Sequence, residues 1–596
     1  MRLHKEKLMN IILTAINAKY IHSSLAAYSL YEYLSDDEKQ HVKIMEFTIN
    51  QQEDLIVSEL LRTKPDVLAF SCYIWNIDLI MSIIETFKKI MPHLPIILGG
   101  PEVSYDSEPD SQGKCTGIKN EAYSLLADII VKGEGEDAFK EIVAQFINRK
   151  TNKFFLSSPS SYPSQEGLCP TEMNGGGKEA IEPQNTQPLS LDSIPFVYTN
   201  RLPSLNNRII YYETSRGCVN SCGFCLSSAT KGVRFLSQQR IESDLNKFLT
   251  EKVKQVKFVD RTFNCNRSHA LFIWEFLIKN DNGITNFHFE IAGELLSSDM
   301  LKLLNTARKG LFQFEIGVQS TNPKTLAAIS RKTNTEKLFK NVNTLMSFGN
   351  IHLHLDLIVG LPHECYISFQ KSFNDVFALR PHKLQIGFLK LLKGSQLHKD
   401  AERYGIVYKK NAPYNVLKTD FITFDEINNI HKIEHMVETF YGSKGFNASV
   451  KLLLCSFNSP FTLFDSLASH WEQCGYHLVS HKKMAMYSFL HSFVLQFLPD
   501  KVHQICELLK FDMLLQENIR SFPSWVTEYY QPDNKLITRT VGVHTFAYDI
   551  LSWLEHPLPS VPQKNERKEC LEPLRKEVTI TFDYAIDLDK GRAKSL

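Results

Sequence analysis

The chain has 596 residues, of which 43% are hydrophobic and 22% are charged, and its formal net charge is +1. A chain of this length is too long to fold around one hydrophobic core. Its length predicts about three or four domains. The near-zero charge excludes a general electrostatic attraction to nucleic acid or to an anionic membrane, although a local basic groove stays open.

Short β-branched segments alternate with longer amphipathic segments over residues 1–150. Strands are predicted at 11–16, 42–47, 67–71 and 96–98, and helices between them, for example at 23–34 and 78–90. This alternation predicts a doubly wound parallel sheet, an α/β fold. Ligands of such sheets bind beyond the carboxyl ends of the strands, so the loops there are candidate binding segments.

Polar residues and glycines gather in four of these loops. Glycine lets the backbone approach a ligand closely, and polar neighbours supply hydrogen bonds. Packing in the core is the alternative for Tyr73 and Trp75. The candidates are Asn17 and Tyr20 in the first loop, Ser71, Tyr73 and Trp75 in the second, Gly99, Gly100 and Glu102 in the third, and Gly133, Glu134, Gly135 and Glu136 in the fourth.

The pattern changes after residue 150. Residues 151–205 are predicted to form a flexible linker or insertion, because the stretch from 157 to 190 is rich in Ser, Pro, Gly and Gln. Strand and helix patterns resume over 206–403 and predict a (β/α)6 partial TIM barrel, whose chemistry lies at the carboxyl ends of its strands. These strands are predicted at 209–214, 255–259, 286–291, 313–318, 352–359 and 383–389.

Residues 404–596 are predicted to form a mostly helical, aromatic-rich domain with one short strand at 577–582. Aromatic faces of helices are more often core than pocket, so the sequence assigns no catalytic residue here. Conceivable walls of a substrate pocket are Trp525, Tyr529, Tyr530 and His544.

Three cysteines, Cys218, Cys222 and Cys225, follow the first strand of the barrel with the spacing CxxxCxxC. A closed zinc site takes four Cys or His ligands, and the next cysteine along the chain is Cys265. Three thiolates on one short loop can instead bind three corners of a [4Fe–4S] cluster and leave the fourth iron open. A zinc site completed by a distant residue and three incidental core cysteines are the alternatives.

This loop, with Phe224 as the aromatic residue before the last cysteine, resembles the CxxxCxΦC loop of the radical S-adenosylmethionine superfamily. The resemblance implies that the three cysteines bind a [4Fe–4S] cluster and that S-adenosyl-L-methionine chelates its open iron. Reductive cleavage then gives a 5′-deoxyadenosyl radical. By resemblance, the residues that contact S-adenosylmethionine are Phe224, Asp260, Glu290, Gln319, Ile358 and Gly360.

Some residues near the barrel strand ends have a second interpretation. Asp260 could face the substrate instead of S-adenosylmethionine. Cys265 and Cys365 lie just beyond strand ends, where a second thiol could act, and ordinary packing is the competing interpretation for both.

The four N-terminal loops resemble those of the cobalamin-binding domain of class B radical S-adenosylmethionine enzymes, which implies that they bind cobalamin. The Asp-x-His-x-x-Gly motif that supplies a lower axial histidine in methionine-synthase-type domains is absent, and His22 has a different spacing. The corrinoid is therefore expected to be base-off, with Trp75 or Tyr73 as candidates for its lower face. Relatives that keep this domain without cobalamin leave a cobalamin-free protein as an alternative.

The domain order resembles that of a B12-dependent radical S-adenosylmethionine methyltransferase with an uncharacterised C-terminal extension. The expected reaction is methyl transfer to an unactivated carbon. The alternatives are a radical rearrangement or oxidation without methylation, and a corrinoid or redox sensor that is not an enzyme. Methylthiotransferases of transfer RNA carry three further N-terminal cysteines, whereas this region has only Cys72 and Cys115.

Expected partners are a reductant such as flavodoxin or ferredoxin and a small-molecule or peptide substrate. Neither nucleic acid nor a membrane is expected, because the charge is near zero and no stretch reaches the about 18 to 20 apolar residues of a spanning helix. The 12 cysteines, mostly isolated, favour a reducing cytoplasm.

Overall fold

A computed structural model describes residues 8–105, 108–109, 115–116, 126–151, 179–181, 189–228, 232–517, 519, 521–527, 541–555, 573–583 and 594–595. Most of the predicted linker, together with Tyr529 and Tyr530, lies outside these residues. The chain divides into two compact units, Met1–Gly317 with Leu326–His352 and Phe388–Asp420, and Val318–Thr325 with Leu353–Gly387 and Phe421–Leu596. The four-part division expected from the sequence stays a prediction.

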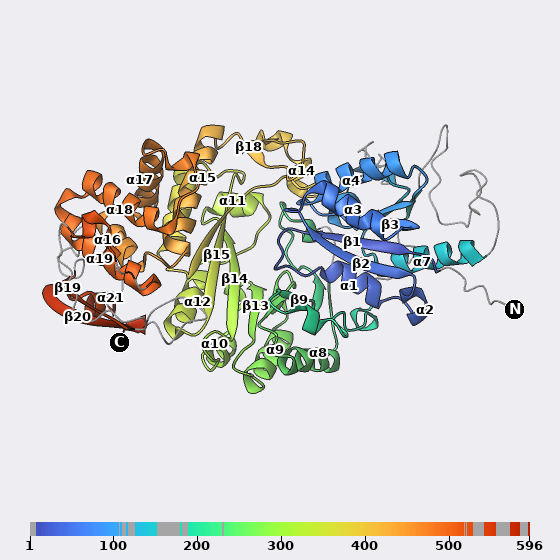
Figure 1. Ribbon diagram of the computed structural model, residues 1–596, viewed down its shortest axis with the longest axis horizontal. Coiled ribbons are helices and arrows are strands. Elements are labelled where there is room, and N and C mark those ends of the chain that lie inside the picture. Colours follow the sequence, from blue (N-terminus) through green and yellow to red (C-terminus); the bar gives the residue numbers. More distant parts are fainter. Residues whose placement is uncertain are drawn as a thin grey trace. The chain divides into compact units, whose positions relative to one another are not determined.

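The first unit begins with a six-stranded parallel sheet that has helices on both faces (Figure 1). Neighbouring strands pair in parallel throughout, in the order β2-β1-β3-β4-β7-β8. The strands are β1 (Ile11–Asn17), β2 (Val42–Thr48), β3 (Val67–Ser71), β4 (Ile96–Gly99), β7 (Ile129–Val131) and β8 (Glu179–Ile181).

Successive residues of the inner strands enter two separate cores. Ile12 and Leu68 pack with helices α3 (Glu53–Arg62) and α4 (Ile77–Ile90) on one face. Ile11 and Val67 pack with α1 (Leu25–Glu32) and α7 (Glu136–Thr151) on the other. Because both faces are covered, the strands are apolar throughout instead of alternating, and the predicted doubly wound sheet is confirmed.

A second six-stranded sheet has the order β16-β15-β14-β13-β12-β9, and each predicted barrel strand is present. A hairpin, β10 (Ser215–Gly217) with β11 (Val233–Phe235), follows the first strand. The strands are β9 (Ile210–Tyr212), β12 (Gln255–Phe258), β13 (Asn286–Ile291), β14 (Phe312–Gln319), β15 (His352–Val359) and β16 (Lys383–Phe388). The accompanying helices are α8 (Gln238–Thr250), α9 (Arg267–Lys279), α10 (Ser298–Leu304), α11 (Pro323–Ala328), α12 (Thr335–Phe348), α13 (Tyr366–Phe377) and α14 (Gln396–Lys399).

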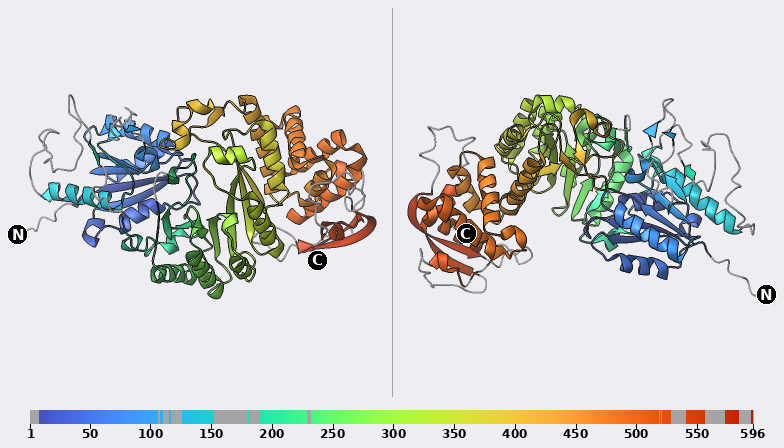
Figure 2. Two further views of the ribbon diagram at one scale, coloured as in Figure 1. Left: turned by 180° about the vertical axis from the view of Figure 1, so that it is seen from behind. Right: turned by 90° about the horizontal axis from the view of Figure 1, so that it is seen from above.

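The strands of this sheet have one apolar face and one polar face. In β14, Phe312, Phe314 and Ile316 are buried, whereas the residues between them are half-buried. The buried ring of Phe314 contacts that of Trp274 in α9, one of the helices that lie along the strands (Figure 2). The polar side chains therefore gather on the opposite face, where a ligand of a partial barrel would bind.

The C-terminal part of the second unit is mostly helical, as predicted, and the strand predicted at 577–582 is confirmed within β20 (Arg575–Asp583). Its antiparallel partner β19 (Val541–Tyr548) was not predicted, although its residues alternate in burial. The helices are α15 (Phe424–Met436), α16 (Asn447–Ser456), α17 (Pro460–Gln473), α18 (Lys483–Phe497) and α19 (Val502–Gln516).

Two of the four conceivable pocket residues of this region lie within the described part of the chain, and both pack against other rings. Trp525 stacks on His491, with 4.8 Å between the ring centroids. His544 is buried and contacts the rings of Phe522 and Phe582. These contacts favour packing over a pocket role.

None of the described helices is long and apolar enough to span a bilayer.

A buried aspartate of α19 caps the neighbouring helix α16. Asp512 accepts hydrogen bonds from the backbone amides of Ala448 (3.0 Å) and Ser449 (2.9 Å) and from the Ser449 hydroxyl (2.7 Å). Carboxylates stabilise helix N-termini in this way. Burial nevertheless dominates and raises the pKa of Asp512 to about 7.

This pKa predicts that the second unit loses stability as the pH rises. Between pH values near 4 and 7 the folded chain retains a proton on Asp512 that the unfolded chain releases, so rising pH favours unfolding, by up to about 4 kcal/mol. The loss levels off above pH 7. Asp512→Asn should abolish this dependence in urea unfolding midpoints, whereas the exposed Asp500→Asn should keep it. Parallel pH profiles for wild type and Asp512→Asn would contradict the prediction.

Candidate cluster and cofactor site

The three-cysteine loop lies between the two strands of the β10–β11 hairpin, and these strands are in very close contact. Gly217, the residue before Cys218, has a φ of +110°, and a Cβ atom there would overlap the carbonyl oxygen of Gly232. Only glycine fits such a backbone without strain. Farther along the loop, Gly223 donates to the carbonyl of Ile329 (2.9 Å) and accepts from the amide of Leu397 (2.8 Å). The loop is therefore held at both ends.

Hydrogen-bond donors surround two of the three sulfur atoms. The sulfur of Cys218 accepts from the amide of Asn220 (3.4 Å) and lies 3.5 Å from the hydroxyl of Thr262. Arg331 points a guanidinium nitrogen at the buried sulfur of Cys222 (3.7 Å) and another at the carbonyl of Gly317 (2.5 Å). Donors of this kind stabilise thiolates and the charge of a bound cluster.

The thiol of Cys222 is electrostatically coupled to its two neighbours in the loop. Burial raises its pKa, Arg331 opposes that shift, and the thiols of Cys225 and Cys218 raise the pKa further. Within the described residues, no three His, Cys, Asp or Glu side chains converge on a position for one metal ion. A cubane cluster takes each thiolate on a different iron, so its ligands need not converge on one point. The donor set of the loop thus fits a [4Fe–4S] cluster.

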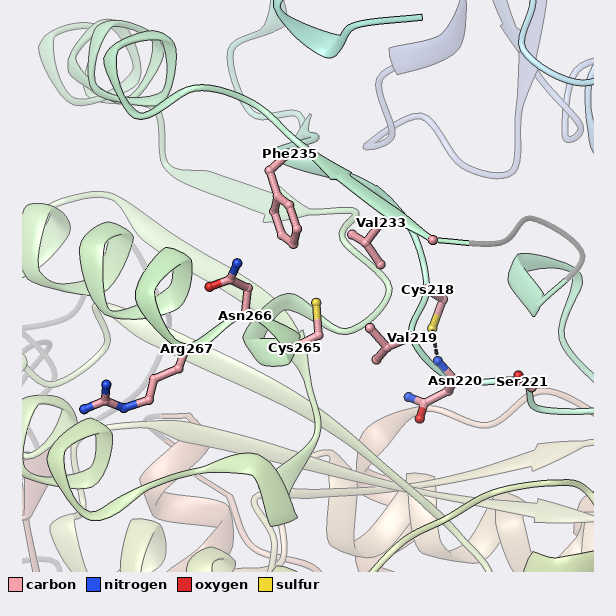
Figure 3. Close-up of a pocket in the computed structure, with 10 residues that line it drawn as sticks. Cys218, Val219, Asn220, Ser221, Val233, Phe235, Cys265, Asn266 and Arg267 are labelled. Atoms are coloured by element: carbon pink, nitrogen blue, oxygen red, sulfur yellow. Dashed lines mark hydrogen bonds between the residues drawn. The ribbon is translucent and has the colours of Figure 1, made fainter. Parts of the chain in front are cut away.

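A cavity of about 680 Å³ adjoins the first cysteine (Figure 3). The sequence left Cys265 open between a thiol role and packing, and its side chain is half-buried in the wall of this cavity. Cys365, in contrast, is exposed at the start of α13. The lining consists of Cys218, Val219, Asn220, Ser221, Gly232, Val233, Phe235, Cys265, Asn266 and Arg267.

Asp260, a predicted contact of S-adenosylmethionine, is bonded to residues at the start of the hairpin. Its side chain is fully buried and accepts from the amide (3.1 Å) and hydroxyl (2.7 Å) of Thr214 and from the hydroxyl of Ser215. Burial raises the pKa of Asp260 to about 6. These bonds tie the end of β12 to the start of the hairpin, so the carboxylate supports the loop from behind.

Glu290 belongs to a charged cluster on the polar face of β12, β13 and β14. Lys257 lies 3.6 Å from Glu290 and 3.0 Å from Glu315, and His288 lies 3.2 Å from Glu315. Burial acts to raise the pKa of Glu315, but the hydrogen bond from His288 and the charge of Lys257 outweigh it and bring the pKa to about 2. The pKa of Glu290 is raised by burial.

Three residues of this cluster were missed from the sequence, namely Lys257, His288 and Glu315. The signal that could have found them is their alternation with apolar residues on three successive strands, which places them on one face. Phe224, the remaining candidate of the first unit, is half-buried between two cysteines of the loop.

In the second unit, Gln319 ends β14 with a φ of +71°, a conformation that non-glycine residues seldom adopt outside functional sites. The residues after it are anchored: the amide of Thr321 donates to the hydroxyl of Ser372 (3.0 Å), which donates to the buried Glu364 (2.9 Å). Ile358 is half-buried in β15, and Gly360 follows that strand with a φ of +89°.

The second loop of the N-terminal sheet carries a stacked aromatic pair, in which Trp75 is exposed and Tyr73 is half-buried. Tyr73 and Trp75 stack with centroids 4.3 Å apart and planes 10° from parallel, and Trp75 is 45% exposed. The indole nitrogen donates to the carbonyl of Ile16 (3.3 Å). The Asn76 amide bonds to that carbonyl and to the carbonyl of Ser71, both at 3.0 Å. Trp75 therefore presents an exposed ring that is fixed in place by its hydrogen bond to Ile16 and by its stack on the half-buried Tyr73.

The third loop crosses directly over the second. Gly100 has a φ of +114°, and a Cβ atom there would lie 2.5 Å from the carbonyl oxygen of Cys72. The amide of Cys72 donates to the carbonyl of Gly99 (2.7 Å). In the first loop, Tyr20 is exposed under the guanidinium of Arg208 and Asn17 donates to Glu46 (2.9 Å).

The carboxylates of the third and fourth loops face cations and hydroxyls of the later chain. Glu102 accepts from the hydroxyl of Tyr414 and lies 3.5 Å from Lys393. Glu134 and Glu136 both pair with Arg216, at 3.1 and 2.9 Å. Between these carboxylates and the preceding strand, Gly133 has a φ of +75°.

His22, the weaker axial candidate, is bonded to the barrel. Its Nδ1 lies 2.6 Å from the hydroxyl of Tyr211 on β9, and burial lowers its pKa. The ring is therefore occupied by a protein partner in this structure.

Family models match three successive parts of the chain. A B12 binding domain matches residues 11–143, the radical SAM superfamily matches residues 212–376, and a protein family of unknown function, DUF4080, matches residues 402–583. These matches confirm the two domains expected by resemblance and give the C-terminal extension a family without an assigned activity.

Two curated relatives and one solved structure are similar to this chain. The cobalamin-dependent radical SAM methyltransferase TokK of Streptomyces tokunonensis is 25% identical over 58% of this chain and 50% of its own length. The 2-(S-pantetheinyl)-carbapenam-3-carboxylate methyltransferase of Streptantibioticus cattleyicolor is 27% identical over 59% and 48%.

The chain thus spans about half the length of these curated relatives. The fold is similar to that of the cobalamin-dependent S-adenosylmethionine radical enzyme OxsB, with a TM-score of 0.52, 16% identity and coverage of 85% of this chain and 79% of that one. The chain therefore carries a region matching the B12 binding domain, then one matching the radical SAM superfamily and then one matching DUF4080, and it is similar to cobalamin-dependent radical SAM enzymes.

Proposed function

We propose that the protein is a B12-dependent radical S-adenosylmethionine enzyme that transfers a methyl group to an unactivated carbon. The observation that carries the proposal is the union, within one compact unit, of the three-thiol loop and a B12-binding domain. The relatives above that share both domains are named methyltransferases, which supports the same reaction.

The roles of the residues follow from their positions. Cys218, Cys222 and Cys225 would hold the cluster, with Arg331 and Thr262 orienting two of the sulfurs. When bound, the cluster supplies the electron that cleaves S-adenosylmethionine, and the corrinoid supplies the methyl group. Residues proposed to bind S-adenosylmethionine are Phe224, Asp260, Glu290, Gln319, Ile358 and Gly360. Asp260 would also hold the start of the hairpin through its bonds to Thr214.

The corrinoid would lie on the loops of the N-terminal sheet. The Tyr73–Trp75 stack offers a flat apolar surface suited to its lower face, and Gly99, Gly100, Gly133 and Gly135 allow close approach of the backbone. Asn17, Tyr20 and Ser71 would complete the site, while the side chains of Glu102, Glu134 and Glu136 hold the loops in place through their ion pairs.

Trp75→Ala should weaken cobalamin binding about tenfold or more, because a half-exposed indole that a ligand covers contributes more than about 1.4 kcal/mol. The measurement is a titration of apoprotein with hydroxocobalamin followed by visible absorption. Phe424→Ala, an exposed aromatic of the second unit, is the matched control. Equal affinity of the Trp75→Ala variant and the wild type would remove this residue from the site.

The reaction is tested on anaerobically reconstituted protein with S-adenosylmethionine and dithionite, with and without cobalamin. We expect 5′-deoxyadenosine, together with S-adenosylhomocysteine that forms only when cobalamin is present, since regeneration of the methyl donor consumes a second S-adenosylmethionine. Formation of 5′-deoxyadenosine without the homocysteine product would favour rearrangement or oxidation. Absence of both products from protein with an intact cluster would favour a sensor.

The partners proposed from the sequence are a flavodoxin- or ferredoxin-type reductant and a small-molecule or peptide substrate. Relatives named as transfer-RNA methylthiotransferases match a smaller share of the chain, for example 24% identity over 35% of it for a threonylcarbamoyladenosine tRNA methylthiotransferase of Pyrococcus horikoshii. With only Cys72 and Cys115 in its N-terminal region, this chain lacks the further three cysteines of that class, which supports methyl transfer over methylthiolation.

A further inference from the structure

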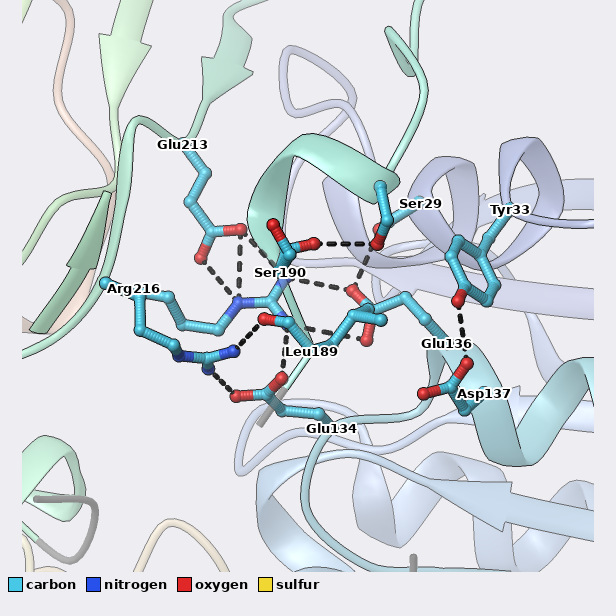
Figure 4. A network of polar contacts seen from close by, with 11 residues as sticks. Ser29, Tyr33, Glu134, Glu136, Asp137, Leu189, Ser190, Glu213 and Arg216 are labelled. Atoms are coloured by element: carbon cyan, nitrogen blue, oxygen red, sulfur yellow. Dashed lines mark hydrogen bonds and ion pairs between the residues drawn. The ribbon is translucent and has the colours of Figure 1, made fainter. Parts of the chain in front are cut away.

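A partly buried ion network joins the fourth loop of the B12-binding domain to the hairpin whose two strands flank the three-cysteine loop (Figure 4). Arg216 of β10 lies 3.1 Å from Glu134, 2.9 Å from Glu136 and 2.8 Å from Glu213. Its register partner Arg234 of β11 also pairs with Glu134. One guanidinium therefore contacts the carboxylates on both sides of Gly135.

The Arg216–Glu136 pair is the part of the network most shielded from water. The side chain of Glu136 is only 6% exposed and that of Arg216 is 20% exposed. Burial acts to raise the pKa of Glu136, but the charge and hydrogen bonds of Arg216 lower it below its usual range, so the pair is ionised. The hydroxyl of Ser29 adds a further bond to Glu136 (3.0 Å). Buried, branched pairs of this kind define geometry far more strictly than surface pairs do.

The position of Arg216 in the chain makes this geometry relevant to chemistry. It stands two residues before Cys218, and its partners belong to the loop that is proposed to approach the corrinoid. Methyl transfer through a radical requires one substrate carbon to meet two cofactors in sequence. Small misplacements of reacting groups cost large factors in rate, so the separation of the two cofactor loops has to be held tightly.

We infer that Arg216 is a positioning residue that sets the distance between the corrinoid and the iron–sulfur cluster by clamping the Gly133–Glu136 loop to the cluster loop. The inference rests on the proposed function, because it requires both cofactors. Lysine cannot replace arginine here, since a single ammonium does not span two carboxylates with a planar fork. Arg201, which pairs with Glu32 at 3.5 Å and contacts no candidate cofactor residue, serves as the control.

The test is pulsed electron paramagnetic resonance on the protein loaded with reduced cluster and cob(II)alamin, which reports the distance between the two spins without needing the substrate. The wild type and Arg201→Gln should give one narrow distance. Arg216→Gln and Arg216→Lys should bind both cofactors with unchanged stoichiometry and give a longer, broader distribution. Should Arg216→Gln fail to fold, Glu134→Gln breaks the same clamp from the B12-binding domain and should broaden the distribution equally.

The outcomes separate the two proposals. An unchanged distance in Arg216→Lys and Glu134→Gln, with both signals present, would overturn the positioning role and leave the proposed function standing. Absence of either the cluster signal or the cob(II)alamin signal from the wild type would overturn both. Equal broadening in Arg201→Gln would reduce the network to general domain contact and would also overturn the positioning role.

Discussion

Replacing Cys222 with alanine is expected to abolish both the iron–sulfur chromophore and the formation of 5′-deoxyadenosine. Cys222 is the buried thiol of the loop and the one that Arg331 contacts, so no water-exposed substitute ligand reaches its position easily. With two protein thiolates left, a cubane cluster loses one corner ligand. Iron and sulfide content per chain, visible absorbance and chromatography of the nucleoside product measure the effect.

Cys265→Ala is the matched control for this experiment. Cys265 lines the same cavity as Cys218 but stands outside the three-cysteine spacing, and we expect its variant to keep the full cluster content and the cleavage of S-adenosylmethionine. Intact cluster and product in Cys222→Ala would refute the ligand assignment. Loss of the cluster in Cys265→Ala would instead make this cysteine a ligand.

Gly217→Ala is expected to lower cluster content strongly and to destabilise the first unit by more than about 2 kcal/mol. The positive φ of Gly217 is one cause of the instability. The larger cause is the overlap of a Cβ atom with the carbonyl of Gly232, because the Cβ is fixed to the backbone and the carbonyl is part of the backbone, so neither can rotate away. Relief requires the two hairpin strands to separate, which displaces Cys218. Iron content and the midpoint of thermal unfolding report the change.

Gly283→Ala separates the two causes. Gly283 also has a positive φ (+74°), but a Cβ atom there meets no other atom within 4 Å. Its variant should therefore show only the conformational cost of about 1 kcal/mol and an unchanged iron content. If Gly217→Ala behaves like Gly283→Ala in both measurements, the close approach of the hairpin strands does not matter for the cluster.

Much of the fold could be predicted because it depends on local periodicity. Short β-branched segments such as 11–16 predict strands, and their alternation with amphipathic helices predicts a parallel sheet. The sequence does not predict β19, because this strand lies within a region whose aromatic and apolar residues favour helices. In the structure, Gly542, His544 and Phe546 alternate in burial with their neighbours.

The cluster ligands could be predicted from the sequence alone, because all three belong to one short loop. Cys218, Cys222 and Cys225 stand within eight residues of one another, and their number and spacing indicated an iron–sulfur cluster without any long-range contact. The glycines that bracket the loop are visible in the sequence for the same reason.

The partners of the candidate carboxylates could be identified only in the folded chain. Asp260 is bonded to Thr214, Glu290 lies in a cluster with Lys257, and Glu136 pairs with Arg216 80 positions farther along the chain. The sequence pattern around an acidic residue at a strand end is the same whether its side chain faces a ligand or a Lys or Arg side chain of the protein. Its partner depends on the register of the parallel strands and on the packing of the loops of the two sheets. These bring together residues that are far apart in the sequence, so no local sequence pattern predicts the pair.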